Sequence, residues 1–169
     1  MNITSAISER RRLEEWDLSV DERAQVKSKI SSEQWGSSTA KKQFVRVLLT
    51  RLNDAKMAQE SQTRVDGIEV TLQIEHILPE NPNKSSRWCS EWTEEERASW
   101  THRLGNLCLL NEKTNKSLKN HNFSDKRPSY KGKPFPFTQQ ISDFDNWTVD
   151  EVKRQHEHLL QAVERIFKL

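Results

Sequence analysis

The chain has 169 residues, of which 33% are hydrophobic and 31% are charged, and its formal net charge is +2. No stretch approaches the roughly 18 apolar residues that span a bilayer, which argues against a membrane protein. Long Val, Ile and Leu runs, typical of sheets buried on both faces, are also missing. Six Trp and six Phe can still anchor a compact core. The composition therefore predicts a mostly helical, highly charged domain.

The two cysteines and the N-terminus indicate the cellular setting. Cys89 and Cys108 form no C-x-x-C pair, so neither a zinc knuckle nor a disulfide framework is predicted. The segment from Met1 to Arg12 contains three arginines but no apolar stretch of the kind found in signal peptides. A cytoplasmic, reducing environment is therefore expected.

Hydroxyl residues followed three positions later by Glu mark three helix starts. In such a capping box the hydroxyl accepts an amide of the first helical turn, and the Glu reaches back to the cap residue. The pairs are Ser19 with Glu22, Thr93 with Glu96, and Thr148 with Glu151. The last pair opens the clearest amphipathic helix, because apolar residues recur there at three- and four-residue spacing up to the C-terminus.

A second amphipathic helix is predicted over residues 39–58. The residues expected on its apolar side are Phe44, Val45, Leu48, Leu49 and Leu52. Residues 1–30 look helical but weakly apolar, so they are expected to pack peripherally. We therefore divide the chain into an N-terminal helical appendage (1–38) and a main domain (39–169).

The strongest strand pattern lies between these helices, at residues 68–75. Apolar and polar residues alternate there, which predicts a strand with one buried face, and Pro79 ends it. A shorter strand is expected at 106–110, followed by a short helix at 111–119. Between the strands lies an insertion, 80–103, whose tryptophans are expected to form local core rather than a base-stacking surface. These tryptophans are Trp88, Trp92 and Trp100.

A basic stretch follows the second strand, with one acid, Asp125, among its charged residues. The basic residues are Lys113, Lys116, Lys119, Lys126, Arg127, Lys131 and Lys133. A local excess of this kind is typical of proteins that bind the phosphate backbone of a nucleic acid. The alternative interpretation is a solvated surface without a ligand, and for Lys126 a second alternative is an ion pair with a structural carboxylate.

Four polar residues should meet where the two strands and the short helix converge. They are Glu75, His76, Asn106 and Asn115. Phosphodiester hydrolysis needs a general base with a near-neutral pKa, which His76 can supply. It also needs a hard divalent cation, for which carboxylate and amide oxygens are suitable ligands. The combination predicts metal-assisted hydrolysis.

Each of these residues taken alone also has a structural interpretation. His76 can be an ordinary core histidine, and Asn106 can serve the turn after Gly105. Asn111 and Asn120 are alternatives to Asn115. Adjacent strand residues point to opposite faces, so Glu75 and His76 can share one site only if the strand twists or bends before Pro79.

Several segments together resemble a known family. The segment Ile74-Glu75-His76-Ile77-Leu78-Pro79 resembles the D/E-H-I-x-P opening of HNH (His-Me finger) nucleases. The segment 104–110 is similar to their central x-N-L strand, and Asn115 falls where the third motif residue sits. Five further residues resemble the tail of the C-terminal nuclease domain of GmrSD-type restriction enzymes, which are modification-dependent (type IV) systems. These residues are Phe123, Lys126, Tyr130, Trp147 and Arg154.

This resemblance, which covers about residues 39–169, implies a role for each site residue. The implied fold is mainly α with a small β-hairpin, a ββα-metal (His-Me finger) core surrounded by helices. His76 would be the general base, Asn106 would hold the His76 loop, and Glu75 and Asn115 would bind Mg²⁺ or Mn²⁺. Many HNH nucleases have Asp in place of Glu75, and the third motif residue here is Asn115 rather than His. Such an oxygen-rich site suits Mg²⁺ better than Zn²⁺.

The resemblance also implies an upstream ParB-like nucleotide-binding domain. The chain has four Gly and no Gly-rich phosphate loop, so we expect it to be the C-terminal part of a longer protein. The predicted function is a metal-dependent HNH DNA endonuclease or nickase of a restriction or phage-defence system. A catalytically silent DNA-binding or regulatory domain and an RNA-directed nuclease toxin are the alternatives. Retention of all four motif residues favours an active enzyme over the silent domain.

Overall fold

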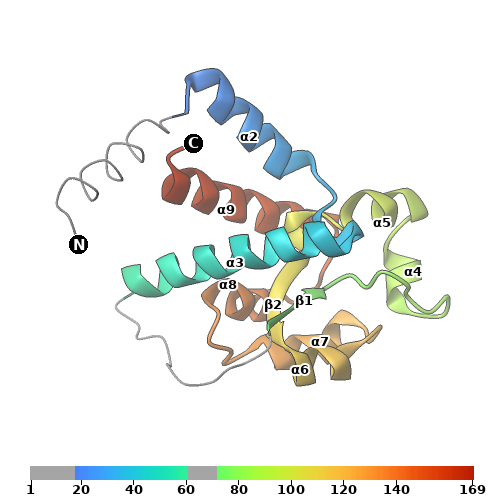
Figure 1. Cartoon of the computed structure of the whole chain (residues 1–169). Coiled ribbons are helices and arrows are strands. Elements are labelled where there is room, and N and C mark those ends of the chain that lie inside the picture. Colours follow the sequence, from blue (N-terminus) through green and yellow to red (C-terminus); the bar gives the residue numbers. More distant parts are fainter. Residues whose placement is uncertain (1–17, 61–71) are drawn as a thin grey trace.

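The structure, a computed structural model, describes residues 18–60 and 72–169. Helices predominate in this part of the chain, and two strands form a small antiparallel sheet, which confirms the predicted fold class. In Figure 1, α3 (Thr39–Gln59) and α9 (Val149–Phe167) lie together on one side of the sheet. The short helices α6 (Glu112–Leu118) and α7 (Phe123–Tyr130) lie on the other side. No helix among the described residues is both long and apolar enough to cross a membrane.

The sheet consists of β1 (Leu72–His76) and β2 (Leu107–Asn111). Its antiparallel register pairs Leu72 with Asn111 at one end and His76 with Leu107 at the other. The second strand begins one residue later than predicted, because Asn106 closes the 3₁₀ turn η2 (Leu104–Asn106). Positions 68–71 of the predicted first strand lie outside the described residues.

Both faces of this sheet are covered, whereas the alternating pattern predicted one buried face. Leu72 and Ile74 pack against the core formed with α3 and α9, as expected. On the opposite face, Glu75 is only 5% exposed, and its neighbour across the sheet, Cys108, is buried as well. The reason is tertiary, since α7 covers the face that the sequence pattern leaves polar.

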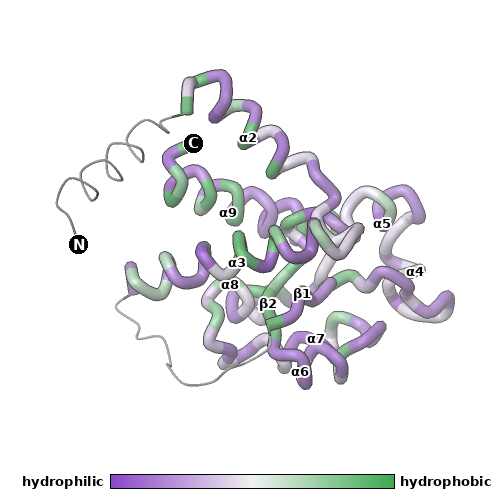
Figure 2. The backbone as a smooth tube through the Cα atoms, in the orientation of Figure 1, coloured by the Kyte–Doolittle hydropathy of each residue, from purple (hydrophilic) through white to green (hydrophobic). Residues whose placement is uncertain are grey.

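The core on the α3 side combines residues from distant parts of the chain. It contains Leu48 and Leu52 of α3, Leu159 and Val163 of α9, and Leu109 of β2. Figure 2 shows the corresponding pattern, with hydrophobic and hydrophilic residues alternating along α9 and a largely hydrophobic β2. The amphipathic pattern of both long helices therefore predicts this core.

The segment before residue 39 contributes to the same core. Ile30 of α2 (Val20–Ser32) and Trp35 of the 3₁₀ turn η1 (Trp35–Ser37) are buried in it. Phe44, which we expected on the buried side of α3, is 50% exposed and stacks on Trp35 with the ring centroids 4.8 Å apart. The division of the chain at residue 38 stays a prediction.

The insertion between the strands folds into α4 (Arg87–Glu91) and α5 (Glu94–Trp100). Trp88 and Trp92 are both 2% exposed, and each donates its indole N–H to a backbone carbonyl at 2.9 Å. Their role as local core is therefore confirmed, and Trp100 is half-buried beside α9. The helix α8 (Pro136–Gln139) and the turn η3 (Gln140–Asp143) complete the chain before α9.

All three capping boxes are present as predicted. They begin α2, α5 and α9, and in each one the Glu side chain accepts the amide of the cap residue. The signals are local, since each satisfies amides that the first helical turn leaves without partners. This explains why the helix starts could be predicted without knowledge of the packing.

Candidate active site

Asn106, the residue directly before β2, is fully buried and contacts the loop that follows β1. Its Oδ1 accepts the backbone N–H of Leu78 at 2.8 Å and the indole N–H of Trp147 at 3.0 Å. Its Nδ2 donates to the carbonyls of Leu78 at 2.9 Å and Thr101 at 2.8 Å. The backbone carbonyl of Asn106 also accepts the N–H of Ile77 at 3.0 Å. Asn106 thereby anchors both residues that follow His76, Ile77 through its backbone carbonyl and Leu78 through its side chain.

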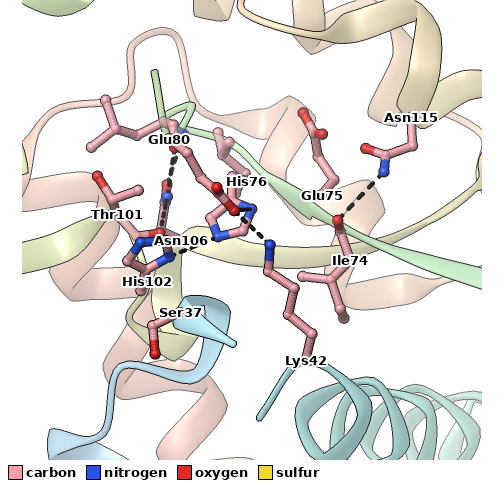
Figure 3. A network of polar contacts seen from close by, with 12 residues as sticks. Ser37, Lys42, Ile74, Glu75, His76, Glu80, Thr101, His102, Asn106 and Asn115 are labelled. Atoms are coloured by element: carbon pink, nitrogen blue, oxygen red, sulfur yellow. Dashed lines mark hydrogen bonds and ion pairs between the residues drawn. The ribbon is translucent and has the colours of Figure 1, made fainter. Parts of the chain in front are cut away.

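His76 ends β1 and has a polar neighbour at each ring nitrogen. Its Nε2 lies 3.1 Å from Nδ1 of His102, and its Nδ1 lies 3.4 Å from a carboxylate oxygen of Glu80. The same carboxylate oxygen accepts a hydrogen bond from Nζ of Lys42 at 2.7 Å. Figure 3 shows these residues gathered around the His76 ring. They come from β1, α3 and both ends of the insertion.

The turn η1 covers the His76 ring, which is 8% exposed. A Cβ atom added to Gly36 would lie 2.3 Å from Nε2 of His76 and 2.8 Å from Nδ1 of His102. No side chain fits at that distance without a shift, so this close approach requires glycine. The N-terminal segment therefore forms one wall of the candidate site.

Burial has the largest effect on the pKa values of His76 and His102. It lowers the pKa of His76 to about 3, although the neighbouring Glu80 carboxylate opposes the shift. Burial likewise lowers the pKa of His102. Partial burial would raise the pKa of Glu80, but the hydrogen bond from Lys42 and the surrounding positive charge lower it. At neutral pH His76 is therefore uncharged and can accept a proton, but its pKa lies well below the near-neutral value predicted for the general base.

Glu75 belongs to a separate cluster on the opposite face of the sheet. Its Oε1 accepts from Nζ of Lys126 at 2.8 Å and from the Tyr130 hydroxyl at 3.3 Å. Lys126 also donates to the carbonyls of His76 at 2.8 Å and Ile77 at 3.1 Å. Burial raises the pKa of Glu75, while the positive charge of Lys126 opposes that shift.

The position of Lys126 shows that one prediction made from the basic stretch is wrong. We expected it to contact a phosphate backbone, but its side chain is fully buried. Three acceptors at the end of β1 hold its ammonium group, which is how a protein can bury such a charge. Lys126 therefore stabilises the strand end from within.

The bend that would bring Glu75 and His76 to one site is not seen. The strand stays paired with β2 through His76, so the two side chains leave it on opposite faces. In Figure 3 the Glu75 side chain points away from the cluster around His76. Glu75 contacts α7, whereas His76 contacts residues of the insertion.

Asn115 lies on α6 beside β1, where its Nδ2 donates to the carbonyl of Ile74 at 3.4 Å. The two alternatives have structural roles. Asn111 caps α6 by accepting the amide of Thr114 at 2.7 Å, and Asn120 donates to the carbonyl of Asn81 at 2.6 Å. Among the three asparagines, Asn115 is therefore the one whose side chain contacts the residue next to Glu75.

Two groups of residues have the chemistry to hold a metal ion. Glu75 and Asn115 offer a carboxylate and an amide oxygen, a donor set that fits a hard cation such as Mg²⁺. Within the described residues, His76, Glu80 and His102 form a second group, whose ligand atoms all lie within 4.8 Å of one another. Sequence reasoning missed Glu80 and His102. The spacing of four between His76 and Glu80 was the available signal, whereas His102 comes from the insertion and had none.

The exposed part of the basic stretch is smaller than the sequence suggests. Lys113, Lys116, Lys119 and Lys131 are exposed. Arg127 is partly buried, donates to the carbonyl of Ser142 at 2.9 Å and pairs with Asp145 at 3.0 Å. Lys133 is also partly buried. Three of the four exposed lysines lie on or directly after α6, the helix that carries Asn115.

Acid is expected to destabilise the fold between about pH 6.5 and pH 4. The Nδ1 atom of buried His156 accepts the amide of Gly105 at 3.2 Å, and burial lowers the pKa of His156 from 6.5 to about 4. The unfolded chain binds a proton in this range and the folded chain does not, so stability is complete above pH 6.5 and falls as the pH decreases. The full effect is on the order of 3 kcal/mol.

Melting temperatures at pH 7.5 and pH 5 measure this effect. A His156→Gln variant should show a smaller difference between the two pH values than the wild type. Replacing the exposed His121 by Gln should leave the difference unchanged. Equal acid sensitivity in the wild type and the His156→Gln variant would show that His156 does not cause it.

The family comparison matches the resemblance seen in the motifs. A family model described as GmrSD restriction endonucleases, C-terminal domain, matches residues 22–162. The match begins within α2 and includes every residue of the site described above. No curated protein matches the chain significantly. Since the family model covers most of the sequence, the chain belongs to the GmrSD restriction endonucleases, as their C-terminal domain.

Proposed function

We propose that this domain is a metal-dependent DNA endonuclease or nickase of the HNH type, within a modification-dependent restriction system. The observation that carries the proposal is the pair of hydrogen bonds between the Asn106 side chain and the backbone of Leu78. These bonds hold the loop next to His76, which is buried and neutral. Family membership supports phosphodiester hydrolysis as the reaction. An upstream ParB-like domain that senses the modification completes the proposed full-length protein.

His76 acts as the general base and accepts a proton from the attacking water. One ring nitrogen must face that water, and in the structure Nε2 faces His102 at 3.1 Å. We propose that the half-buried His102 ring turns away from Nε2 when substrate binds. Asn106 keeps the loop after His76 in place during this change, because its four side-chain hydrogen bonds do not involve the histidines.

In this proposal Glu75 and Asn115 would hold Mg²⁺ or Mn²⁺. Glu75 and His76 leave β1 on opposite faces, so the end of the strand must turn when substrate binds before both can act on one phosphate. A cation held there would supply stabilisation of the charge that develops on the scissile phosphate. Asn115 contributes its amide oxygen, since its nitrogen already donates to Ile74. Lys126 lies 2.8 Å from Oε1 of Glu75 and lowers the attraction of that carboxylate for a cation. Metal binding is therefore expected to be weak and to require millimolar Mg²⁺.

Cleavage of supercoiled plasmid in the presence of Mg²⁺ or Mn²⁺ tests the proposal directly. We expect conversion to nicked or linear plasmid, and complete loss of conversion when EDTA is added. An Asn115→Ala variant should need a higher Mg²⁺ concentration because it lacks one of very few protein ligands. Asn120→Ala is the matched control and should keep the wild-type requirement.

Three outcomes of this assay would contradict the proposal or part of it. Plasmid that stays intact with every divalent ion supports the silent regulatory domain instead. Degradation of a labelled RNA without cleavage of DNA supports the RNA-directed toxin. A metal requirement that shifts in Asn120→Ala rather than in Asn115→Ala would mean that the ligand is Asn120, two residues after the end of α6, and not Asn115.

The exposed lysines near α6 are proposed to contact the DNA backbone, and salt dependence measures those contacts. Affinity for duplex DNA should fall with salt at a log–log slope of about −0.9 for each phosphate contacted. Replacing Lys113 and Lys116 by Ala should make the slope shallower by about 1.8, two such contacts, for every DNA sequence alike. Lys153→Ala, which removes an exposed lysine of α9, is the control. An unchanged slope in the double variant would mean that these lysines form only a solvated surface.

A further inference from the structure

We propose that His76, Glu80 and His102 form a binding site for a borderline transition metal such as Zn²⁺, and that its occupancy silences the nuclease. This site differs from the oxygen site at Glu75 and Asn115 in its ligands and in the face of the sheet on which it lies. Metal binding rests on the geometry alone. The silencing rests on the proposed role of His76 as the general base.

The spacing of the ligand atoms suits a small tetrahedral ion. Zn²⁺ binds imidazole nitrogen at about 2.0–2.1 Å, which places two such nitrogens about 3.3 Å apart in a tetrahedral site. Nε2 of His76 and Nδ1 of His102 lie 3.1 Å apart. All three ligand atoms lie within 4.8 Å of one another, and the Glu80 carboxylate, which lies beside Nδ1 of His76, must move toward Nε2 to join the two nitrogens. The side chain of Glu80 is 38% exposed and can make this movement.

The carboxylate of this site already has a positive charge beside it, which a bound cation would replace. The carboxylate of Glu80 is neutralised by Nζ of Lys42, 2.7 Å away, and the Lys42 side chain is 40% exposed. A dication at the ligand atoms would take over this neutralisation and release Lys42 into solvent. Lys42 therefore competes with the metal, since like charges at such distances repel.

The donor set determines which metals can use the site. Two imidazoles and one carboxylate suit Zn²⁺, Co²⁺ or Ni²⁺, whereas Mg²⁺ strongly prefers oxygen ligands. Zn²⁺ can therefore bind in the presence of excess Mg²⁺. A metal bound to His76 uses the nitrogen lone pair that would otherwise accept the proton of water. The two metals would thus have opposite effects on cleavage.

Titration of the purified domain with Co²⁺ and Zn²⁺ measures binding without any reference to activity. Visible absorption reports the coordination of Co²⁺, and calorimetry reports the affinity for Zn²⁺. We expect one equivalent to bind. Loss of a direct ligand in Glu80→Gln or His102→Ala should weaken binding by more than the roughly 10–100-fold cost of losing an outer partner. His121→Ala, which removes an exposed histidine elsewhere, should bind as the wild type does.

The Lys42→Met variant tests the competition independently. Removing a positive charge next to a bound dication should tighten Zn²⁺ binding by about tenfold. Unchanged or weaker binding in Lys42→Met contradicts the proposed position of the metal. Circular dichroism and thermal melting verify that each variant is folded, and Glu80→Gln changes a partly exposed side chain.

Plasmid cleavage in millimolar Mg²⁺ with added Zn²⁺ then tests the silencing. We expect loss of cleavage at Zn²⁺ concentrations that saturate the site, and cleavage by Lys42→Met should be lost at a lower concentration. Absence of wild-type binding, or equal binding by Glu80→Gln, overturns the metal site. Binding without loss of cleavage overturns the silencing alone. A domain that never cleaves overturns the proposed function and the silencing with it, while the titration still decides the metal site.

Discussion

Replacing His76 by alanine is expected to lower the rate of plasmid cleavage by about 10²–10⁴-fold, the usual contribution of a general base. The alanine side chain cannot accept a proton from water. Neither neighbour can take over this role in place. The Nδ1 atom of His102 lies 3.1 Å from the position of Nε2 of His76, and the Glu80 carboxylate is paired with Lys42. Initial nicking rates at saturating Mg²⁺ measure the effect.

The stability of the His76→Ala variant distinguishes a catalytic role from a structural one. Its backbone contacts remain, because Lys126 and Asn106 hold the carbonyl of His76 and the loop after it. We therefore expect a small change in melting temperature beside a large change in rate. His121→Ala controls for the loss of a histidine elsewhere. Wild-type cleavage by folded His76→Ala protein would exclude His76 as the base.

Replacing Lys126 by methionine is expected to destabilise the domain by about 3–5 kcal/mol, because the change leaves a buried carboxylate without its partner. The ammonium group has three acceptors at the end of β1, namely Glu75 and the carbonyls of His76 and Ile77. Methionine fills a similar volume but donates no hydrogen bond. At about 2–4 °C for each kcal/mol in a domain of this size, the melting temperature should fall by about 10 °C.

A second substitution tests whether the unpaired carboxylate causes this loss. Adding Glu75→Gln to Lys126→Met removes the buried charge and should restore part of the stability, so the two effects should not add. Lys131→Met, at an exposed position five residues later in the basic stretch, should change stability by less than about 0.5 kcal/mol. If the Lys126→Met protein has the melting temperature of the wild type, the buried ion pair does not contribute to stability.

Local signals in the sequence determined the elements of this fold. Ser19, Thr93 and Thr148 begin their helices as predicted, since a capping box satisfies the amides of the turn beside it and needs no distant partner. The apolar stripe of α9 and the strand β1 follow from periodicity alone. The motif around residues 74–79, taken together with Asn106, Asn115 and the spaced residues between Phe123 and Arg154, also indicated the family.

Only the tertiary structure decided how the charged residues are used. Lys126 looked like part of a basic surface, yet it is buried against Glu75, from which it is separated by about fifty positions in the chain. His102 and Glu80 surround His76 because the insertion folds back onto the strand end, and Gly36 covers the ring because α2 and η1 pack on the same core. Periodicity and capping indicate only contacts between residues that are close in the sequence, so they could not show that these distant residues meet. Whether a charged side chain faces water or a buried partner depends on which segments meet, and the packing of the whole domain decides that.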